Sequence, residues 1–265
     1  MVKTKSSVVL VQKRGPVTRI VLNNAPRLNA IDSEMASALL AALKDVGDDP
    51  ACRCLSITGS GRSFSAGQAL PAHHGGEELP RDIARLIRTS YIPIISQIRA
   101  LGIPVVADVN GLATGAGFAL ALAADIRLAS QAAWFSCGYA AIGLVPDAGC
   151  SYFLSRYLGL PKALEIALTG RRIQALEAQS LGLVASVFSE RAFTDECLAF
   201  ARRLAAGPTR AYALTKRALS LGLVHTLDEQ MELEASLQQE ASETDDFREG
   251  VASFRDRRTP HFTGR

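Results

Sequence analysis

One local pattern occurs twice in the first half of the chain: a short apolar strand that runs into a turn of small residues. CLSITG (54–59) leads into SGRSFSAGQAL, and IPVVADVNG (103–111) leads into GLATGAGFALALAAD. Ala66 in SAG and Ala116 in GAG occupy equivalent points of the two units. Such repetition predicts an α/β protein whose core is built from repeated β-β-α turns.

The strand pattern stops near Asp195, and helical spacing of apolar residues dominates from there to the end. We therefore expect a core over residues 1–195 and a helical region over residues 196–265. The apolar stripe Leu227, Met231 and Leu237 is typical of a helix that packs against the body or against another subunit.

Composition excludes several classes of protein. The chain has 265 residues, 48% of them hydrophobic, so it can bury a substantial core. A net charge of +3, with basic residues spread along the chain, gives no argument for nucleic acid as a partner. No apolar run reaches the roughly 18 residues of a membrane span, and the basic opening segment fits a β-hairpin better than a targeting peptide. We expect a soluble protein of the cytoplasm.

Neither the cysteines nor the histidines predict a metal site. Five cysteines without a CxxC pair argue against a zinc ribbon or a disulfide framework. His73 and His74 are adjacent in a loop that has no further histidine nearby, whereas a metal site needs several convergent ligands.

The second small-residue turn, GLATGAG, precedes an apolar segment that should be a buried helix. It is not a dinucleotide motif, because Leu120 stands where the third Gly or Ala is required. Free N–H groups at the start of such a helix can stabilise an oxyanion, and small residues let a carbonyl approach closely. Close packing of the helix explains the glycines equally well, so both interpretations stay open.

Asp147, in GLVPDAG, also has two interpretations. It follows Pro146 and precedes a predicted helix, a position typical of an N-terminal cap. A carboxylate in a turn of small residues is also suited to general acid or base catalysis.

The segment Val106–Ile126 resembles the signature of the crotonase superfamily, the enoyl-CoA hydratases and isomerases. Four further segments resemble the family's CoA-binding opening, first oxyanion loop, catalytic turn and C-terminal end, in that order: LNNAPRLNAID, SFSAGQAL, GLVPDAG and EGVASFRDRRTPHFTG. The resemblance therefore covers nearly the whole chain.

This resemblance implies a crotonase-like spiral of ββα turns with a C-terminal helical region that forms trimers or hexamers. It also implies an acyl-CoA thioester as substrate, with no separate cofactor and no metal, and an oxyanion hole made by the N–H groups of Ala66 and Ala116. The positions that correspond to substrate or CoA contacts are Arg27, Leu28, Ala30, Gln68, Leu70 and Tyr139.

The hydratases of this family use two glutamates to manage a water molecule, and Ala119 and Tyr139 stand at those positions here. Asp147 matches the single acid of some family isomerases, including members similar to ring-1,2-epoxyphenylacetyl-CoA isomerase. We therefore expect an isomerase; a hydratase and a non-catalytic acyl-CoA-binding homologue are the alternatives. Trp134, Phe135, Tyr139 and the loop 71–80 are candidates for the acyl pocket.

Overall fold

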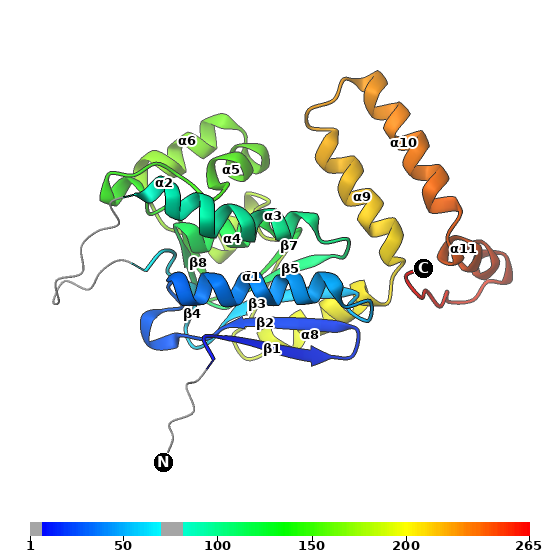
Figure 1. Cartoon of the computed structure of the whole chain (residues 1–265), viewed down its shortest axis with the longest axis horizontal. Helices are drawn as coiled ribbons and strands as arrows, with labels where there is room; N and C mark the ends of the chain where they lie inside the picture. Colours follow the sequence, from blue (N-terminus) through cyan, green and yellow to red (C-terminus); the bar gives the residue numbers. More distant parts are fainter. Residues whose placement is uncertain (1–6, 70–81) are drawn as a thin grey trace, which may run out of the picture.

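The computed structural model describes residues 7–69 and 82–265 and contains an α/β core with two sheets (Figure 1). The larger sheet is parallel apart from its first pair, and its strands in spatial order are β1 (Val9–Arg14), β2 (Val17–Leu22), β3 (Cys54–Gly59), β5 (Val105–Val109), β7 (Ile126–Ser130) and β10 (Ser186–Phe188). The smaller sheet has the order β4 (Ser63–Ser65), β6 (Leu112–Thr114), β8 (Trp134–Ser136) and β9 (Ile173–Gln174).

The two sheets arise from the repeated units. The pairs β3–β4, β5–β6 and β7–β8 each contribute a first strand to the larger sheet and a second strand to the smaller one. Consecutive units lie in parallel register, since Leu55 pairs with Val105 and Ser63 pairs with Leu112. The prediction of repeated β-β-α turns is confirmed.

Helices cover and fill this double sheet. Those of the core are α1 (Ser33–Asp48), α2 (Ile83–Leu86), α3 (Ile92–Ala100), α4 (Ala116–Ala123), α5 (Cys150–Leu158), α6 (Leu160–Thr169) and α7 (Ala175–Ser180), with short helical turns η1 (Ala25–Arg27), η2 (Ile87–Tyr91) and η3 (Ala140–Ile142). Helix α4 is buried along its whole length, as its uniformly apolar sequence predicts. It packs between α3 and α5, near the centre of the core.

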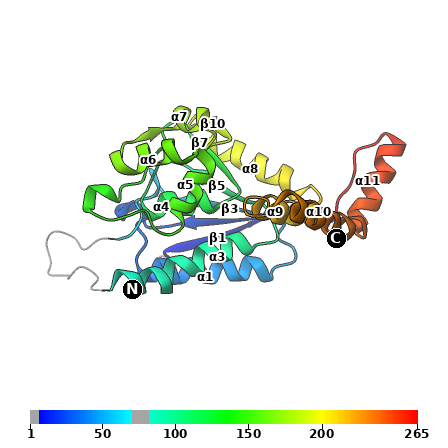
Figure 2. The same ribbon diagram turned by 90° about the horizontal axis from the view of Figure 1, so that it is seen from above.

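Four helices make up the C-terminal part of the chain: α8 (Phe193–Ala205), α9 (Thr209–Leu221), α10 (Leu227–Ser242) and α11 (Asp245–Asp256). Helix α8 packs on the larger sheet, where Phe193 and Cys197 contact Val106 and its neighbours. The expected boundary at residue 195 therefore falls inside α8. Helix α9 contacts the core through Lys216, which pairs with Asp125 and donates to the carbonyls of Leu101 and Ile103. Helix α11 stands away from the core in both views (Figures 1 and 2). No helix of the described residues is long and apolar enough to cross a membrane.

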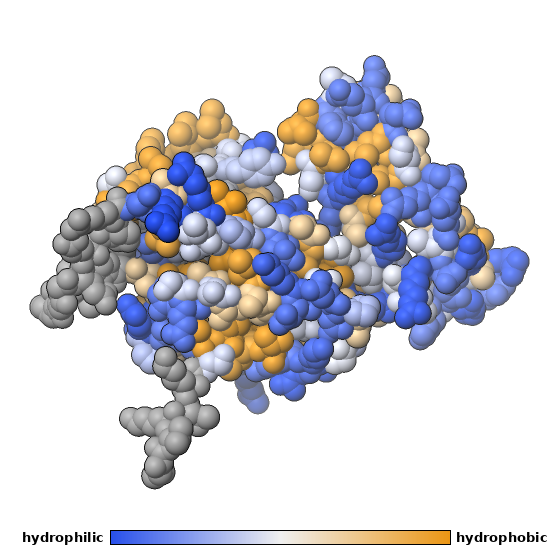
Figure 3. Space-filling view, in the orientation of Figure 1, coloured by the Kyte–Doolittle hydropathy of each residue, from blue (hydrophilic) through white to orange (hydrophobic). Residues whose placement is uncertain are grey.

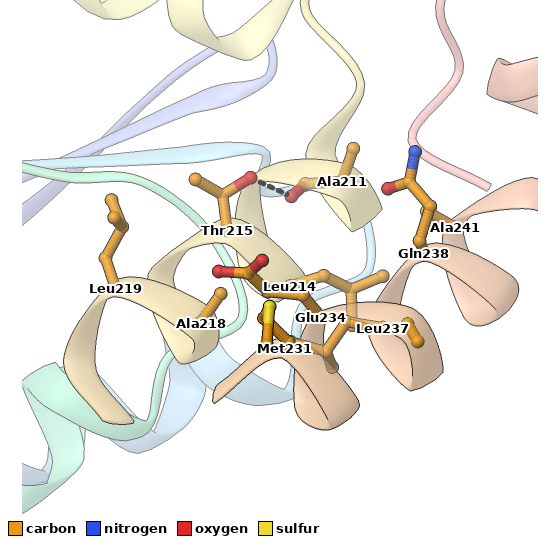
Figure 4. Close-up of a pocket in the computed structure, with 11 residues that line it drawn as sticks. Ala211, Leu214, Thr215, Ala218, Leu219, Met231, Glu234, Leu237, Gln238 and Ala241 are labelled. Atoms are coloured by element: carbon orange, nitrogen blue, oxygen red, sulfur yellow. Dashed lines mark hydrogen bonds between the residues drawn. The ribbon is translucent and has the colours of Figure 1, made fainter. Parts of the chain in front are cut away.

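Helices α9 and α10 form an antiparallel pair with an apolar groove of about 600 Å³ between them (Figure 4). Leu237 of the predicted stripe is buried there, whereas Leu227 and Met231 are 74% and 50% exposed. Leu223 and Val224, in the turn between the helices, are also exposed, and hydrophobic surface gathers there (Figure 3). Contiguous exposed apolar surface of this kind marks an interaction site.

We predict that this surface is covered by self-association, so the chain of 28.2 kDa should scatter light as a trimer of about 85 kDa or as a pair of trimers. Met231→Glu should lower the mass, because it places a charge in the apolar surface. Val11→Glu is the matched control, since Val11 is 48% exposed on β1. A monomeric wild-type protein at micromolar concentration would contradict the prediction.

Candidate active site

The first small-residue turn follows β4 and lies against the segment that follows η1. The Ala66 N–H donates to the Leu28 carbonyl at 2.9 Å. Two further main-chain bonds join the segments: the Ile31 N–H to the Gly67 carbonyl at 2.7 Å, and the Ala69 N–H to the Ile31 carbonyl at 3.0 Å. The predicted CoA-binding opening and the predicted oxyanion loop are therefore held side by side.

Asn29 fastens these segments together, a role that the sequence analysis missed. Its side chain is fully buried, and Nδ2 donates to the carbonyls of Ser60 (2.9 Å) and Ser63 (2.8 Å). The main-chain carbonyl of Asn29 accepts a 2.8 Å hydrogen bond from the Ser65 hydroxyl. Asn29 also has a positive φ of 55°, which Asn adopts more readily than most residues. The shape of the first turn thus depends on this buried amide.

The structure does not support Ala66 as an oxyanion donor, because its N–H is already bonded to Leu28. Gln68 is placed differently. It forms an isolated parallel bridge with Ile31, and the bonds of that bridge use the main-chain groups of its two neighbours, Gly67 and Ala69. Within the described ranges, no hydrogen bond takes the Gln68 N–H. The free donor of the first turn therefore lies two residues beyond the predicted one.

The second turn ends at Ala116, the first residue of α4. The residue before it is Gly115, and no side chain caps the helix. The first intrahelical bond joins the Ala119 N–H to the Gly115 carbonyl, which leaves the N–H of Ala116 without an intrahelical acceptor. This N–H lies at the positive end of the helix dipole and is suited to hold an anion or a polarised carbonyl.

The two turns are in direct contact, and glycines make that contact possible. A Cβ on Gly67 would lie 2.7 Å from the Thr114 carbonyl oxygen and 3.1 Å from the Ala116 nitrogen. A Cβ on Gly117 would lie 2.4 Å from the Ser65 carbonyl oxygen. Because no side chain separates the turns, the free N–H groups on either side of this junction come close together.

Asp147 does not cap the helix that follows it. Helix α5 begins at Cys150, its N-cap position is Gly149, and no side chain bonds to its first turn. The Asp147 Oδ1 atom is buried and has no hydrogen-bond partner among the described residues. Burial raises the pKa of this carboxyl group, with the nearby Tyr139 hydroxyl acting in the opposite direction. A desolvated carboxylate is a stronger base than one in water.

Tyr139 links the acid to the second turn. Its hydroxyl donates to the main-chain carbonyl of Asp147 at 3.5 Å. Three residues earlier, the Ser136 carbonyl accepts a 3.2 Å bond from the Gly115 N–H. Tyr139 and Ala119, the two positions at which the resemblance places the glutamates of hydratases, are both buried. Neither position supplies a carboxylate in this chain.

Tyr91 is a further side chain of this region that the sequence did not reveal. It is buried at the end of the π-helical turn η2 and lines a cavity of about 170 Å³ together with Gln68. Burial raises the pKa of Tyr91, and the charges of Asp147 and Asp32 raise it further. Its hydroxyl is therefore neutral at ordinary pH and serves only as a hydrogen-bond partner or proton donor.

Other predicted residues lie elsewhere or cannot be placed. Phe135 is a core residue, fully buried with its ring centroid 5.5 Å from that of Phe118, and Trp134 is covered by the Arg172 guanidinium. Arg27 is exposed, 3.8 Å from Asp32. Leu70, the loop 71–80 and the histidine pair at 73 and 74 lie outside the described residues. The described residues contain no group of three or more side chains suited to a metal ion.

Residues 12–265 match the family model described as enoyl-CoA hydratase/isomerase. The 1,2-epoxyphenylacetyl-CoA isomerase of Escherichia coli K12 is 37% identical over 250 residues, which cover 94% of this chain and 95% of that protein. A protein of Rhodobacter capsulatus named "Probable enoyl-CoA hydratase" is 40% identical over 246 residues, 93% of this chain and 94% of that one. Both chemistries therefore occur among the names of similar proteins.

Solved structures agree on the fold. The crystal structure of a protein described as "putative Enoyl-CoA hydratase/isomerase from Mycobacterium abscessus" superposes with a TM-score of 0.91 at 35% identity, covering 97% of this chain and 100% of the other. The enoyl-CoA hydratase of Bacillus anthracis also gives a TM-score of 0.91, at 28% identity and the same coverage.

The contact between the two turns predicts that one added methyl group at Gly117 lowers the stability of the fold. Gly117→Ala should lower the free energy of unfolding by about 1–3 kcal/mol, because its Cβ meets the Ser65 carbonyl. Gly250→Ala is the matched control: its Cβ meets the Phe262 ring at an ordinary 3.7 Å, so this helical substitution should stabilise slightly. Urea unfolding of both variants tests this, and equal stability of the two would contradict it.

Proposed function

The chain belongs to the enoyl-CoA hydratase/isomerase family, and from this premise we propose that it is an isomerase that moves a double bond in, or rearranges, an unsaturated acyl-CoA thioester. The observation that carries the proposal is the environment of the Asp147 carboxylate. Asp147 is a partly desolvated carboxylate whose Oδ1 atom has no hydrogen-bond partner among the described residues, while Ala119 and Tyr139 leave the hydratase positions without a second carboxylate.

In this proposal, the thioester oxygen binds at the junction of the two turns and accepts hydrogen bonds from the N–H groups of Gln68 and Ala116. Both donors are fixed by the fold, so they need little rearrangement when negative charge develops on the oxygen. Removal of one such donor in other enzymes typically slows the reaction about a hundred- to a thousand-fold.

Asp147 acts as the base and then as the acid. Its carboxylate takes a proton from a carbon beside the unsaturated system, and the electrons of that C–H bond move into a dienolate whose oxygen carries the charge. The protonated acid then returns the proton to another carbon of the dienolate. One carboxylate completes the cycle, and no water molecule or added cofactor takes part.

The CoA portion is proposed to lie along the opening segment. Leu28 and Ala30 flank Asn29. The Leu28 carbonyl accepts the Ala66 N–H, and Ile31, the residue after Ala30, forms the bridge with Gln68. Arg27 is exposed at the start of this segment, where its guanidinium can meet a phosphate. CoA is part of the substrate in this reaction.

Hydration is the second candidate, because relatives with both names exist. Addition of water needs one group to activate the water and another to deliver a proton. Asp147 is the one carboxylate that the proposal places at the site, so it would have to perform both tasks. A purely binding function is the third candidate, and the partly desolvated Asp147 carboxylate, with its Oδ1 atom unbonded among the described residues, argues against it.

With a set of enoyl-CoA thioesters, we predict that double-bond migration exceeds water addition. The reason is the absence of carboxylates at Ala119 and Tyr139. Migration is followed from the change in conjugation, and hydration from the 3-hydroxyacyl product. Rapid hydration of crotonyl-CoA without migration in any longer enoyl-CoA would overturn the isomerase proposal, and binding without either reaction would favour the third candidate.

Asp147→Asn is predicted to lower turnover about a hundred- to ten-thousand-fold while acyl-CoA binding is retained. Stability should not fall. Burial raises the pKa of Asp147 in the folded state, so the ionised carboxylate costs stability above its unfolded pKa, and the neutral amide removes that cost.

Asp147→Ala is the companion variant, and the same melting temperature is expected for it because Asp147 caps no helix. Turnover, melting temperature and binding of a non-reactive acyl-CoA should be measured for both variants. Near-normal turnover in folded Asp147→Asn would remove Asp147 from the mechanism.

A further inference from the structure

The C-terminal end of α4 is held by arginine side chains. Arg127 Nη1 donates to the carbonyls of Leu122 at 3.4 Å and Ala124 at 2.8 Å. Arg99 Nη1 donates to the carbonyl of Ala123 at 3.3 Å. Three consecutive carbonyls at the negative end of the helix dipole thus face guanidinium groups, the arrangement in which a cation stabilises a helix.

Arg127 is an unusual cation because it is buried without a carboxylate. Its side chain is only 8% exposed, its Nε donates to the Leu183 carbonyl at 2.5 Å, and its guanidinium lies 4.8 Å from the centre of the Tyr157 ring. Burial lowers the pKa of Arg127, in the direction expected for a desolvated cation. No carboxylate of the described residues forms an ion pair with it.

The charged side chains near Arg127 do not cancel its positive charge. Asp125 is shared by Arg99, at 3.1 Å, and by Lys216 of α9, at 2.7 Å. Lys216 also donates to the carbonyls of Leu101 and Ile103. Arg99, Lys216 and the unpaired Arg127 thus carry three positive charges against the single negative charge of Asp125, which leaves a net positive charge near the C-terminal end of α4. Burial raises the pKa of the neighbouring Cys54 thiol, so this group adds no negative charge at ordinary pH.

This charge acts along the helix that carries the Ala116 donor. Helix α4 has eight residues, so its two ends are about 12 Å apart. At an effective dielectric constant of about 20, one positive charge at that distance stabilises an anion roughly tenfold. The charge and the helix dipole favour a negative charge beside Ala116 in the same sense.

We propose that Arg127, together with Arg99 and Lys216, is an electrostatic positioning group that stabilises the enolate at the opposite end of α4. This inference rests on the proposed function, because it requires that an anion develops beside Ala116. Lys216 is supplied by α9, so docking of the C-terminal helices contributes to the field at the reaction centre. The neutral ground-state thioester is little affected by that field.

The test compares Arg127→Met, which removes the charge, with Arg127→Lys, which keeps the charge but loses the guanidinium geometry. Arg127→Met should lower kcat about tenfold with KM unchanged. It should also raise, by about one unit, the pKa of a bound 3-ketoacyl-CoA, read from the ultraviolet absorbance of its enolate. Arg127→Lys should stay within about threefold of the wild type in both measurements.

Arg203→Met is the matched control, since it removes an exposed charge from α8. It should change neither kcat nor the enolate pKa. If Arg127→Met fails to fold, Lys216→Met removes another charge of the cluster and should raise the enolate pKa in the same direction. Equal losses in Arg127→Met and Arg127→Lys, or an unchanged enolate pKa in folded Arg127→Met or Lys216→Met, would overturn the inference.

The two readouts separate this inference from the proposed function. A wild-type enzyme that isomerises no enoyl-CoA but lowers the pKa of a bound 3-ketoacyl-CoA refutes the isomerase assignment, and a rise of that pKa in Arg127→Met then still supports the role of Arg127. If the wild-type enzyme is an active isomerase and Arg127→Met leaves the pKa of the bound 3-ketoacyl-CoA unchanged, the inference alone is refuted.

Discussion

The direct contact between the two small-residue turns is the constraint on which the site depends. Gly117 touches the Ser65 carbonyl and Gly67 touches the Thr114 carbonyl, with no room for a Cβ at either position. The contact is a consequence of the repeat, since consecutive units contribute parallel strands to the same two sheets and their turns emerge at the same edge. If a methyl group at Gly67 or Gly117 held the two turns apart, the free N–H groups of Gln68 and Ala116 would lie farther from each other.

Helix α4 connects this contact to the rest of the molecule. Its first turn supplies the Ala116 donor, its body is buried between α3 and α5, and its last carbonyls face Arg99 and Arg127. A helix held at both ends cannot shift when charge develops at its N-terminus, so its dipole is already oriented for that charge. Such fixed dipoles are the basis of electrostatic stabilisation in enzymes. The acid at Asp147 differs in that its Oδ1 atom has no hydrogen-bond partner in the described structure, which leaves this oxygen available for proton transfer.

The sequence predicts the architecture well because repetition and apolar patterning are local signals. The repeated turns and the buried α4 agree with the structure. The identity of the first donor could not be predicted in this way, because the direction of an N–H depends on its bridge partner. Because Gln68 is the bridge partner of Ile31, its N–H points away from Ile31, whereas the Ala66 N–H is bonded to the Leu28 carbonyl.

Tertiary packing decides the other differences. Tyr91 reaches the site from a π-helical turn that no local sequence pattern predicts. Helix α8 belongs to the core because Phe193 and Cys197 pack on the larger sheet, although its helical spacing resembles that of the helices after it. The sequence offers both a helix cap and a catalytic acid for Asp147; the cap is absent, because α5 begins three residues later and no side chain bonds to its first turn.

The most direct test of this account is a crystal structure with a non-reactive acyl-CoA thioester bound. We predict that the thioester oxygen lies about 2.7–3.1 Å from the main-chain nitrogens of both Gln68 and Ala116, with the Asp147 carboxylate facing the acyl carbons next to the carbonyl. A thioester oxygen bound away from either nitrogen, or an acyl chain that does not pass Asp147, would contradict it.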